Sequence, residues 1–196
     1  MPSNTIIKKR NNNKINYSID MKKVIALGGS NSVKSINKVL ASFVVNKLID
    51  VEVKVLDLNN YKLPLYGIDV EEEKGIPQDA YKLLNEIKES DGIVLSLAEH
   101  NGTYSTAFKN AFDWMSRIES KLWSEKPMLL MSTSPGERGG ATVLEVAKAR
   151  FSYMGGNIVA EMSFPSFFEN LKDGKVVDKS LNLKLEMAIE KLQTAL

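Results

Sequence analysis

The chain has 196 residues, 43% of them hydrophobic, which suits a single domain with a sizeable core. It contains no cysteine and one histidine, His100. Disulfides, thiolate catalysis and iron–sulfur clusters are therefore excluded, and we expect no metal site. No apolar run approaches the roughly 20 residues of a membrane helix, and the N-terminus lacks the apolar core of a signal peptide, so we expect a cytoplasmic protein.

The formal net charge of +2 is unevenly distributed along the chain. Residues 1–20 carry a net charge of +3 and residues 21–196 a net charge of −1. The first 20 residues are also rich in asparagine and lack periodicity, which predicts a disordered basic tail in front of one domain spanning 21–196. Translation from Met21 would explain the same pattern. Because the domain itself is nearly neutral, we expect no nucleic-acid partner.

Strand and helix patterns alternate along the rest of the chain. The predicted strands are 22–28, 51–57, 92–97, 127–132 and 157–163, and the predicted helices are 35–49, 77–90, 105–122, 140–154 and 179–195. The first helix has an apolar stripe at helical spacing, with Ser35 as its N-cap. Strands that alternate with helices predict βαβ units, and thus an α/β fold with a five-stranded parallel sheet between two helical layers.

The first strand runs into a polar loop, Gly28–Asn37. Lys34 and Ser35 stand at the P-loop spacing from Gly28, but Val33 occupies the position of the second P-loop glycine, so an ATPase or GTPase is disfavoured. The dinucleotide fingerprint G-x-G-x-x-G is absent. Neutral hydroxyls and amides beside a helix N-terminus suit a phosphate monoester held by hydrogen bonds, although an ordinary polar loop with a capping serine gives the same composition.

Two further loops follow the third and fourth strands, and carboxyl ends of parallel strands share one rim of the sheet. Two strand–loop–helix sites in one sheet suggest a ligand with an anionic end and a flat polar end, and a flavin mononucleotide has both. In the loop after residue 97, Asn101-Gly102 predicts a turn with positive φ that would point backbone groups at the edge of such a flavin. His100 and Tyr104 are candidates to flank the flavin ring, although an exposed loop histidine is the plain alternative. The loop after the fourth strand holds Ser134.

The helix that begins near Ser105 is strongly apolar. Its apolar residues, with two just beyond it, are Phe108, Phe112, Trp114, Met115, Ile118, Leu122 and Trp123. We interpret these side chains as core or subunit contacts rather than cofactor contacts. Because they exceed what one sheet face needs, part of this surface is expected to pack against a second copy, which predicts a homodimer or homotetramer with the flavin near the interface.

Taken together, these motifs resemble those of the NADPH-dependent FMN reductase family, which has the flavodoxin-like fold and includes chromate, quinone and azo-dye reductases. The resemblance spans about residues 22–195. The family phosphate loop G-S-x-R-x-x-S-x-N is matched by Gly29, Ser30, Ser32, Ser35 and Asn37. The family flavin loop P-E-Y-N, followed by L-K-N-x-x-D-W, is matched by Ala98–Asn101 and Phe108–Trp114. The L-P-x-Y element appears as Leu63–Tyr66, and the glycine-rich loop as Ser134, Gly136, Gly139 and Gly140.

The resemblance implies an FMN cofactor, NAD(P)H as co-substrate and a small acceptor such as a quinone, a flavin, an azo dye or a metal oxyanion. It implies a ping-pong cycle, in which NADPH passes a hydride to the flavin and leaves before the acceptor enters, and it assigns no catalytic side chain. The compact phosphate loop favours FMN over FAD. The implied cofactor-binding residues are Ser30, Ser32, Ser35, Ile36, Asn37, Ala98, Glu99, His100, Asn101, Gly102 and Ser134.

Three positions depart from the family pattern. Ser32 stands in place of the usual arginine, a loss of charge for which Lys34 is a candidate substitute. Ala98 and His100 stand in place of proline and tyrosine at the wall of the flavin site. Two alternatives therefore stay open: a flavodoxin-like electron-transfer protein, which the near-neutral domain disfavours, and a non-catalytic flavin-binding or scaffold protein with a decayed site.

Overall fold

Five parallel strands form the central sheet of the computed structural model, which describes residues 21–196. The strands are β1 (Lys22–Gly29), β2 (Val51–Leu56), β3 (Gly92–Leu97), β6 (Pro127–Thr133) and β7 (Asn157–Phe164). Their order across the sheet is β2-β1-β3-β6-β7. This order confirms the predicted α/β fold with a flavodoxin-like sheet. The predicted basic tail lies outside the described residues.

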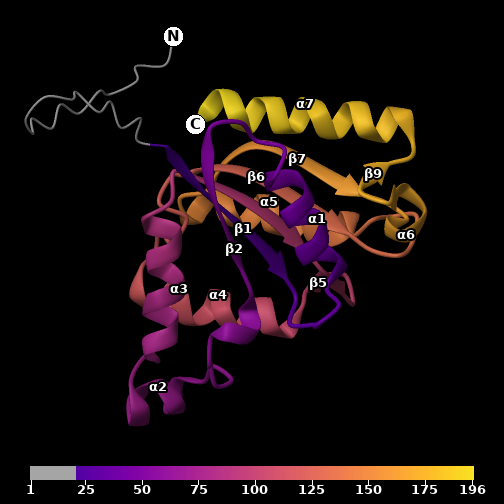
Figure 1. The fold of residues 1–196 in the computed structure, drawn as a ribbon. Helices are drawn as coiled ribbons and strands as arrows, with labels where there is room; N and C mark the ends of the chain where they lie inside the picture. Colours follow the sequence, from indigo (N-terminus) through magenta and orange to yellow (C-terminus); the bar gives the residue numbers. More distant parts are fainter. Residues whose placement is uncertain (1–20) are drawn as a thin grey trace, which may run out of the picture.

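Helices cover both faces of this sheet (Figure 1). One face carries α1 (Ile36–Val45) and α7 (Lys179–Ala195), and the other carries α3 (Gln78–Lys88), α4 (Thr106–Ile118) and α5 (Ala141–Phe151). Within residues 21–196, no helix combines the length and the apolar character needed to cross a membrane.

Short elements that the sequence pattern did not predict join these layers. They are η1 (Leu58–Asn60), α2 (Ile68–Lys74), β4 (Glu99–His100), β5 (Thr103–Tyr104), η2 (Ser152–Met154), α6 (Phe167–Asn170), β8 (Leu171–Lys172) and β9 (Lys175–Val176). Each is too short to show a hydrophobic period, so periodicity could not predict it. Two of them, β4 and β5, form a hairpin that proves central to the site.

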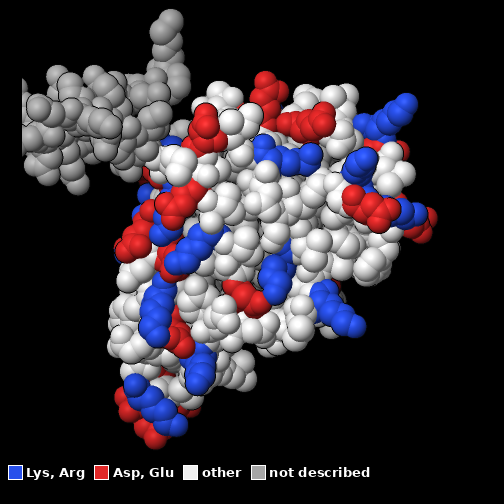
Figure 2. Space-filling view, viewed as in Figure 1, with Lys and Arg blue, Asp and Glu red and all other residues white. Residues whose placement is uncertain are grey.

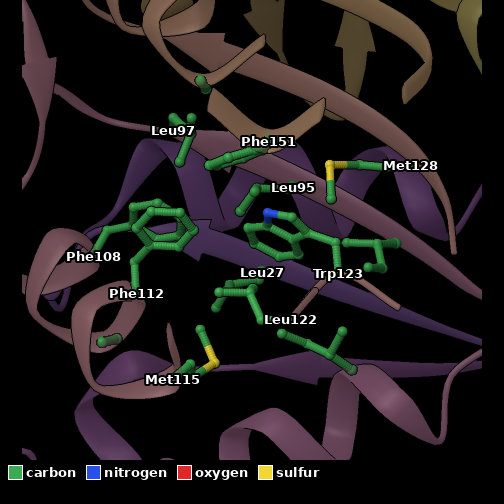
Figure 3. Close-up of a cluster of buried hydrophobic side chains, with 14 of the residues drawn as sticks. Leu27, Leu95, Leu97, Phe108, Phe112, Met115, Leu122, Trp123, Met128 and Phe151 are labelled. Atoms are coloured by element: carbon green, nitrogen blue, oxygen red, sulfur yellow. The ribbon is translucent and has the colours of Figure 1, made fainter. Parts of the chain in front are cut away.

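The alternation of side chains along each strand divides the core into two layers. In β1, Val24 and Ala26 face α1 and α7, whereas Ile25 and Leu27 face α3, α4 and α5. All four side chains are buried, which explains why this strand reads as a continuous apolar run rather than an alternating one. Figure 3 shows the second layer, where Leu27 lies among aromatic side chains from α4 and α5.

Helix α1 begins where the sequence predicts but ends earlier. The Ser35 hydroxyl accepts a hydrogen bond from the backbone N–H of Lys38 (3.1 Å), which confirms the predicted N-cap. The predicted end at residue 49 is wrong, because the helix stops at Val45 and tightens into i→i+3 turns there. Val39, which belongs to the predicted apolar stripe, is 48% exposed.

The apolar side chains of α4 are buried within the chain itself. Those that are buried, including the two beyond the helix, are Phe108, Phe112, Trp114, Met115, Leu122 and Trp123. Trp114 packs against Tyr66, and the others pack against α3, α5 and the sheet. The interpretation as core is therefore confirmed for these six side chains, which leave no apolar surface over for a dimer. The sequence argument failed because it counted the sheet as the helix's one neighbour and missed α3 and α5.

Candidate functional site

Three loops meet at the carboxyl edge of β1, β3 and β6. The strands are adjacent, with Gly29 in register with Leu97 and Leu97 in register with Ser132. The Ser105 hydroxyl donates to the Gly29 carbonyl (2.7 Å), which ties the second loop to the end of β1. The sheet therefore brings the predicted loops to one rim, where switch-point sites of such folds lie.

The first loop presents donors and carries no acidic side chain. Ser30 is half-buried and Ser32 is exposed, and the Ser30 hydroxyl accepts the backbone N–H of Ser32 (3.1 Å). At the start of α1, the backbone N–H groups of Ile36 and Asn37 have no acceptor among residues 21–196. Free N–H groups at a helix N-terminus beside neutral hydroxyls make a cradle for a phosphate.

Asn37 occupies a different position from the rest of the loop, because its side chain points into the protein. Its Oδ1 accepts from the Ser96 hydroxyl (2.7 Å) and from the Thr133 backbone N–H (3.1 Å), and its Nδ2 donates to the Thr133 carbonyl (3.2 Å). The side chain is 2% exposed. The amide thus joins α1 to β3 and β6 and sets where the helix N-terminus lies.

The second loop is the β4–β5 hairpin, with Asn101-Gly102 as its two-residue turn. Both turn residues have positive φ, 51° at Asn101 and 78° at Gly102. The predicted positive-φ turn is confirmed, and its right-handed twist suits a tight hairpin. The turn therefore projects backbone groups from the rim of the sheet.

The residues around this turn divide between surface and core. His100 is exposed on the hairpin, whereas Ala98 is buried beneath it. The hypothesis that Tyr104 flanks the flavin ring is wrong, because the side chain is buried against Phe108, Phe112 and Phe151. Burial raises the pKa of the Tyr104 hydroxyl to about 12.

The third loop follows β6 and is shaped by hydrogen bonds within its own rim. Ser134 is half-buried, and its hydroxyl donates to the Gly136 carbonyl (3.3 Å). The backbone N–H of Phe167 donates to the Ser134 carbonyl (3.1 Å), so α6 supports the loop from behind. This support leaves the exposed side of the loop, Pro135 to Arg138, facing solvent at the same rim.

A hollow of about 620 Å³ opens beside the first two loops. Asn31 and His100 line it from those loops, and Leu58, Leu63, Ala107 and Ala111 are among its apolar lining. The space is large enough for a planar ring system.

The outer wall of this hollow is the L-P-x-Y segment, and α4 holds it in place. The side chain of Asn110 accepts from the Tyr66 backbone N–H (2.8 Å) and donates to the carbonyls of Leu63 (3.1 Å) and Pro64 (3.0 Å). The Trp114 indole N–H also donates to the Pro64 carbonyl (2.7 Å). The spacing of these two α4 residues, which matches the family motif, therefore has a structural role that the sequence alone did not reveal.

An ion pair stands behind the first loop. Lys38 Nζ contacts Asp57, and the side chains are 30% and 26% exposed. The hydrogen bond from Lys38 holds the pKa of the Asp57 carboxyl below its usual value, and the backbone N–H of Asn59 acts in the same direction. Because Lys38 is paired in this way, its charge is directed at Asp57 rather than at the cradle.

Sequence reasoning missed several residues that shape the rim. Asn31 lies between two predicted residues and lines the hollow, so its position in the loop was an available signal. Leu58 and Asn110 reach the hollow from η1 and α4, and the backbone N–H of Val143, on α5, donates to the Glu99 carboxylate (2.9 Å). These contacts join segments about 40 residues or more apart, and no local pattern marks them.

A sequence model of the family described as NADPH-dependent FMN reductase matches residues 22–169. The chain belongs to this family. Membership confirms the resemblance inferred from the motifs, and FMN and NAD(P)H are the cofactor and co-substrate that the family's name and its reductase members indicate.

Individual relatives of this family member are reductases. The quinone reductase of Escherichia coli (strain K12) is 38% identical over 79 residues, which are 40% of this chain and 42% of that protein. The chain thus spans about two fifths of the length of the quinone reductases that it matches. The NADPH azoreductase of Bacillus sp. (strain OY1-2) is 27% identical over 137 residues, covering 70% of this chain and 72% of that protein.

Solved structures share the fold of this FMN reductase family member. FerB from Paracoccus denitrificans, a flavoenzyme NAD(P)H:(acceptor) oxidoreductase, has 27% identity and a TM-score of 0.65, and covers 89% of this chain and 98% of its own. The azoreductase from Bacillus anthracis str. Sterne has a TM-score of 0.63 at 18% identity, covering 89% of this chain and all of that one. At that identity the second comparison supports the fold alone.

Proposed function

We propose that this chain is an FMN-dependent oxidoreductase that takes electrons from NAD(P)H and passes them to a small acceptor, such as a quinone, a flavin, an azo dye or a metal oxyanion, in a ping-pong cycle. The observation that carries the proposal is the arrangement at one rim of the sheet. The free N-terminus of α1 faces that rim, and the Asn101-Gly102 turn projects from it.

The residues present fit a phosphate monoester. The N–H groups of Ile36 and Asn37, with the hydroxyls of Ser30 and Ser32, offer donors, and no carboxylate lies in the loop from Gly28 to Asn37. The loop is compact and we identify no segment within residues 21–196 that would bind the adenylate half of FAD, which favours FMN over FAD. Asn37 would act through the helix that it positions, since its amide already bonds Ser96 and Thr133.

FMN, when bound, supplies the capacity to accept and return a hydride. The chain's own part is to bind and orient: the hairpin would direct backbone groups at the pyrimidine edge, where they stabilise negative charge. Ala98 and His100 would form the wall near the ring, and the Ser134 loop would close the opposite side. The hollow lined by Asn31 and His100 offers space for a planar partner molecule. No side chain is assigned as a catalytic acid or base.

Substitution Ser35→Asp tests the assignment of the phosphate loop. Aspartate is as good an N-cap as serine, so the fold should persist, while its charge opposes a phosphate bound at the same helix N-terminus. Flavin content on purification should fall to near zero while the circular dichroism spectrum stays unchanged. Ser180→Asp, which adds an exposed carboxylate to the first turn of α7, is the matched control for added charge. Unchanged flavin content in Ser35→Asp would refute the assignment.

Two other functions compete with this proposal. A flavodoxin-like electron-transfer protein would dock to its partners through an acidic face, but on the face in Figure 2 acidic and basic side chains are interspersed. A scaffold protein without flavin would follow if Ser32, Ala98 and His100 had abolished binding. Flavin absorbance of the purified protein, followed by NADPH consumption with a quinone and no partner protein, separates the three.

Assembly as a homodimer or homotetramer stays a prediction. The apolar side chains of α4 that first suggested an oligomer are buried inside the chain, so they no longer support this prediction. Light scattering at micromolar concentration measures the mass directly, and a monomer would contradict it.

A further inference from the structure

Helix α5 begins without a side-chain cap of its own. Its N-cap residue, Gly140, has left-handed backbone conformation and offers no side chain, so the first N–H groups of the helix depend on other partners. The carboxylate of Glu99, on β4, accepts the backbone N–H of Val143 (2.9 Å). A negative group at a helix N-terminus also interacts favourably with the helix dipole. Glu99 thus caps a helix that lies more than 40 residues further along the chain.

The hairpin packs along α5 beyond this single bond. A Cβ built on Gly140 would lie 3.6 Å from Glu99 Cβ, and one on Gly102 would lie 3.7 Å from Thr142 Cγ2. Tyr104 stacks on Phe151 at the far end of α5, with ring planes 3° apart and centroids 6.1 Å apart. One side of the hairpin therefore rests on α5 from the first turn of that helix to its last.

Beyond α5, the hairpin is held by Tyr104, which also packs on Phe108 and Phe112 of α4. Its two strands have two residues each, and they pair with each other rather than with the five-stranded sheet. A two-stranded hairpin of this size is not stable on its own in water. Contacts with α5 and α4, and the Ser105 bond to Gly29, therefore set where the turn lies, and of the elements within residues 21–196 α5 alone contacts the Glu99 end of the hairpin by a hydrogen bond.

We infer that Glu99 is a positioning residue, which holds the Asn101-Gly102 turn at the flavin edge by capping α5, and that its carboxylate does not bind the cofactor. The role of the turn rests on the proposed function, whereas the cap itself does not. In this arrangement the Glu99 carboxylate occupies the N-terminus of α5. A ligand at this rim would therefore bind at the N-terminus of α1 rather than at that of α5.

Glu99→Ala and Glu99→Gln test the inference, with Glu145→Ala as a control that removes an exposed carboxylate from α5. Amide hydrogen exchange is measured on the flavin-free protein for Val143 and for His100 and Thr103, which pair across the turn. The FMN dissociation constant is measured by fluorescence titration. Glu99→Ala should expose all three amides to exchange and weaken FMN roughly tenfold, the scale of one lost hydrogen bond to a charged group. Glu99→Gln keeps an oxygen acceptor and should fall closer to wild type in both measurements.

The inference is overturned if Val143 exchanges no faster in Glu99→Ala, or if FMN affinity is unchanged while Val143 is exposed. A fall in FMN affinity with Val143 still protected, in either variant, would instead mean that the carboxylate contacts the flavin. If the wild-type protein itself fails to bind FMN, the proposed function fails. The cap is then judged from the exchange of the three amides alone.

Discussion

Replacing Asn37 with alanine should destabilise the flavin-free protein. The substitution removes three buried hydrogen bonds, of 2.7, 3.1 and 3.2 Å, that join α1 to Ser96 and Thr133. At about 1 kcal/mol net for each bond, the free energy of unfolding should fall by about 3 kcal/mol. With a slope of about 2 kcal/mol per molar urea, the unfolding midpoint should fall by about 1.5 M. Urea titration followed by circular dichroism measures this shift.

The matched control is Asn31→Ala, which removes the same side chain from an exposed position in the same loop and should change the midpoint by less than about 0.25 M. A double-mutant cycle with Ser96→Ala isolates the shared bond and should give a coupling energy of at least about 0.5 kcal/mol. The reasoning is refuted if Asn37→Ala unfolds at the wild-type urea concentration without flavin. That result, with loss of FMN binding, would return Asn37 to the role of a direct ligand.

Gly28→Ala should lower the melting temperature, because its Cβ would lie 2.5 Å from the Lys38 backbone nitrogen and push α1 off the sheet; an unchanged melting curve would contradict this close approach. The pKa of the Asp57 carboxyl is lower in the folded protein than in the unfolded chain, so its pairing with Lys38 stabilises the fold at a pH above the unfolded-state pKa. This contribution is lost as the pH falls through the folded-state pKa. Melting curves of Asp57→Asn and wild type should therefore differ above about pH 5 and converge in stronger acid, whereas a pH-independent difference would count against the ion pair.

The main strands and the start of α1 were predictable because each is indicated by residues close together in the sequence. The buried run of β1 and the capping hydroxyl of Ser35 can be read from a few neighbouring residues, and both lie where the sequence predicted. The end of α1 was not predictable in this way, since apolar residues continue to Leu48 after the helix has stopped. Apolar spacing records which side chains are buried, and a turn buries them as well as a helix does.

The positions of the candidate loops followed from the order of strands, but the roles of individual residues did not. Asn37 and Glu99 both match family motifs that lead into loops at the rim, yet their side chains bond Thr133 and Val143, which arrive from later parts of the chain. Asn110 and Trp114 likewise hold a segment more than 40 residues earlier. A match to a family motif therefore does not show whether a residue binds the ligand or stabilises the structure around it.

By itself, the sequence determined the α/β fold, the three rim loops and the positive-φ turn at Asn101-Gly102, because each depends on residues adjacent in the chain. The tertiary structure alone decided which side chains stay free to meet a ligand. In the tertiary structure the Tyr104 side chain lies in the core, and the apolar face of α4 is covered by other parts of the same chain. The physical reason is that a buried polar group takes whichever partner packing brings within reach, and an apolar side chain is buried by whichever element lies over it. Both the hydrogen-bond partner and the covering element can lie far away in the sequence, so the residues next to a side chain do not reveal them.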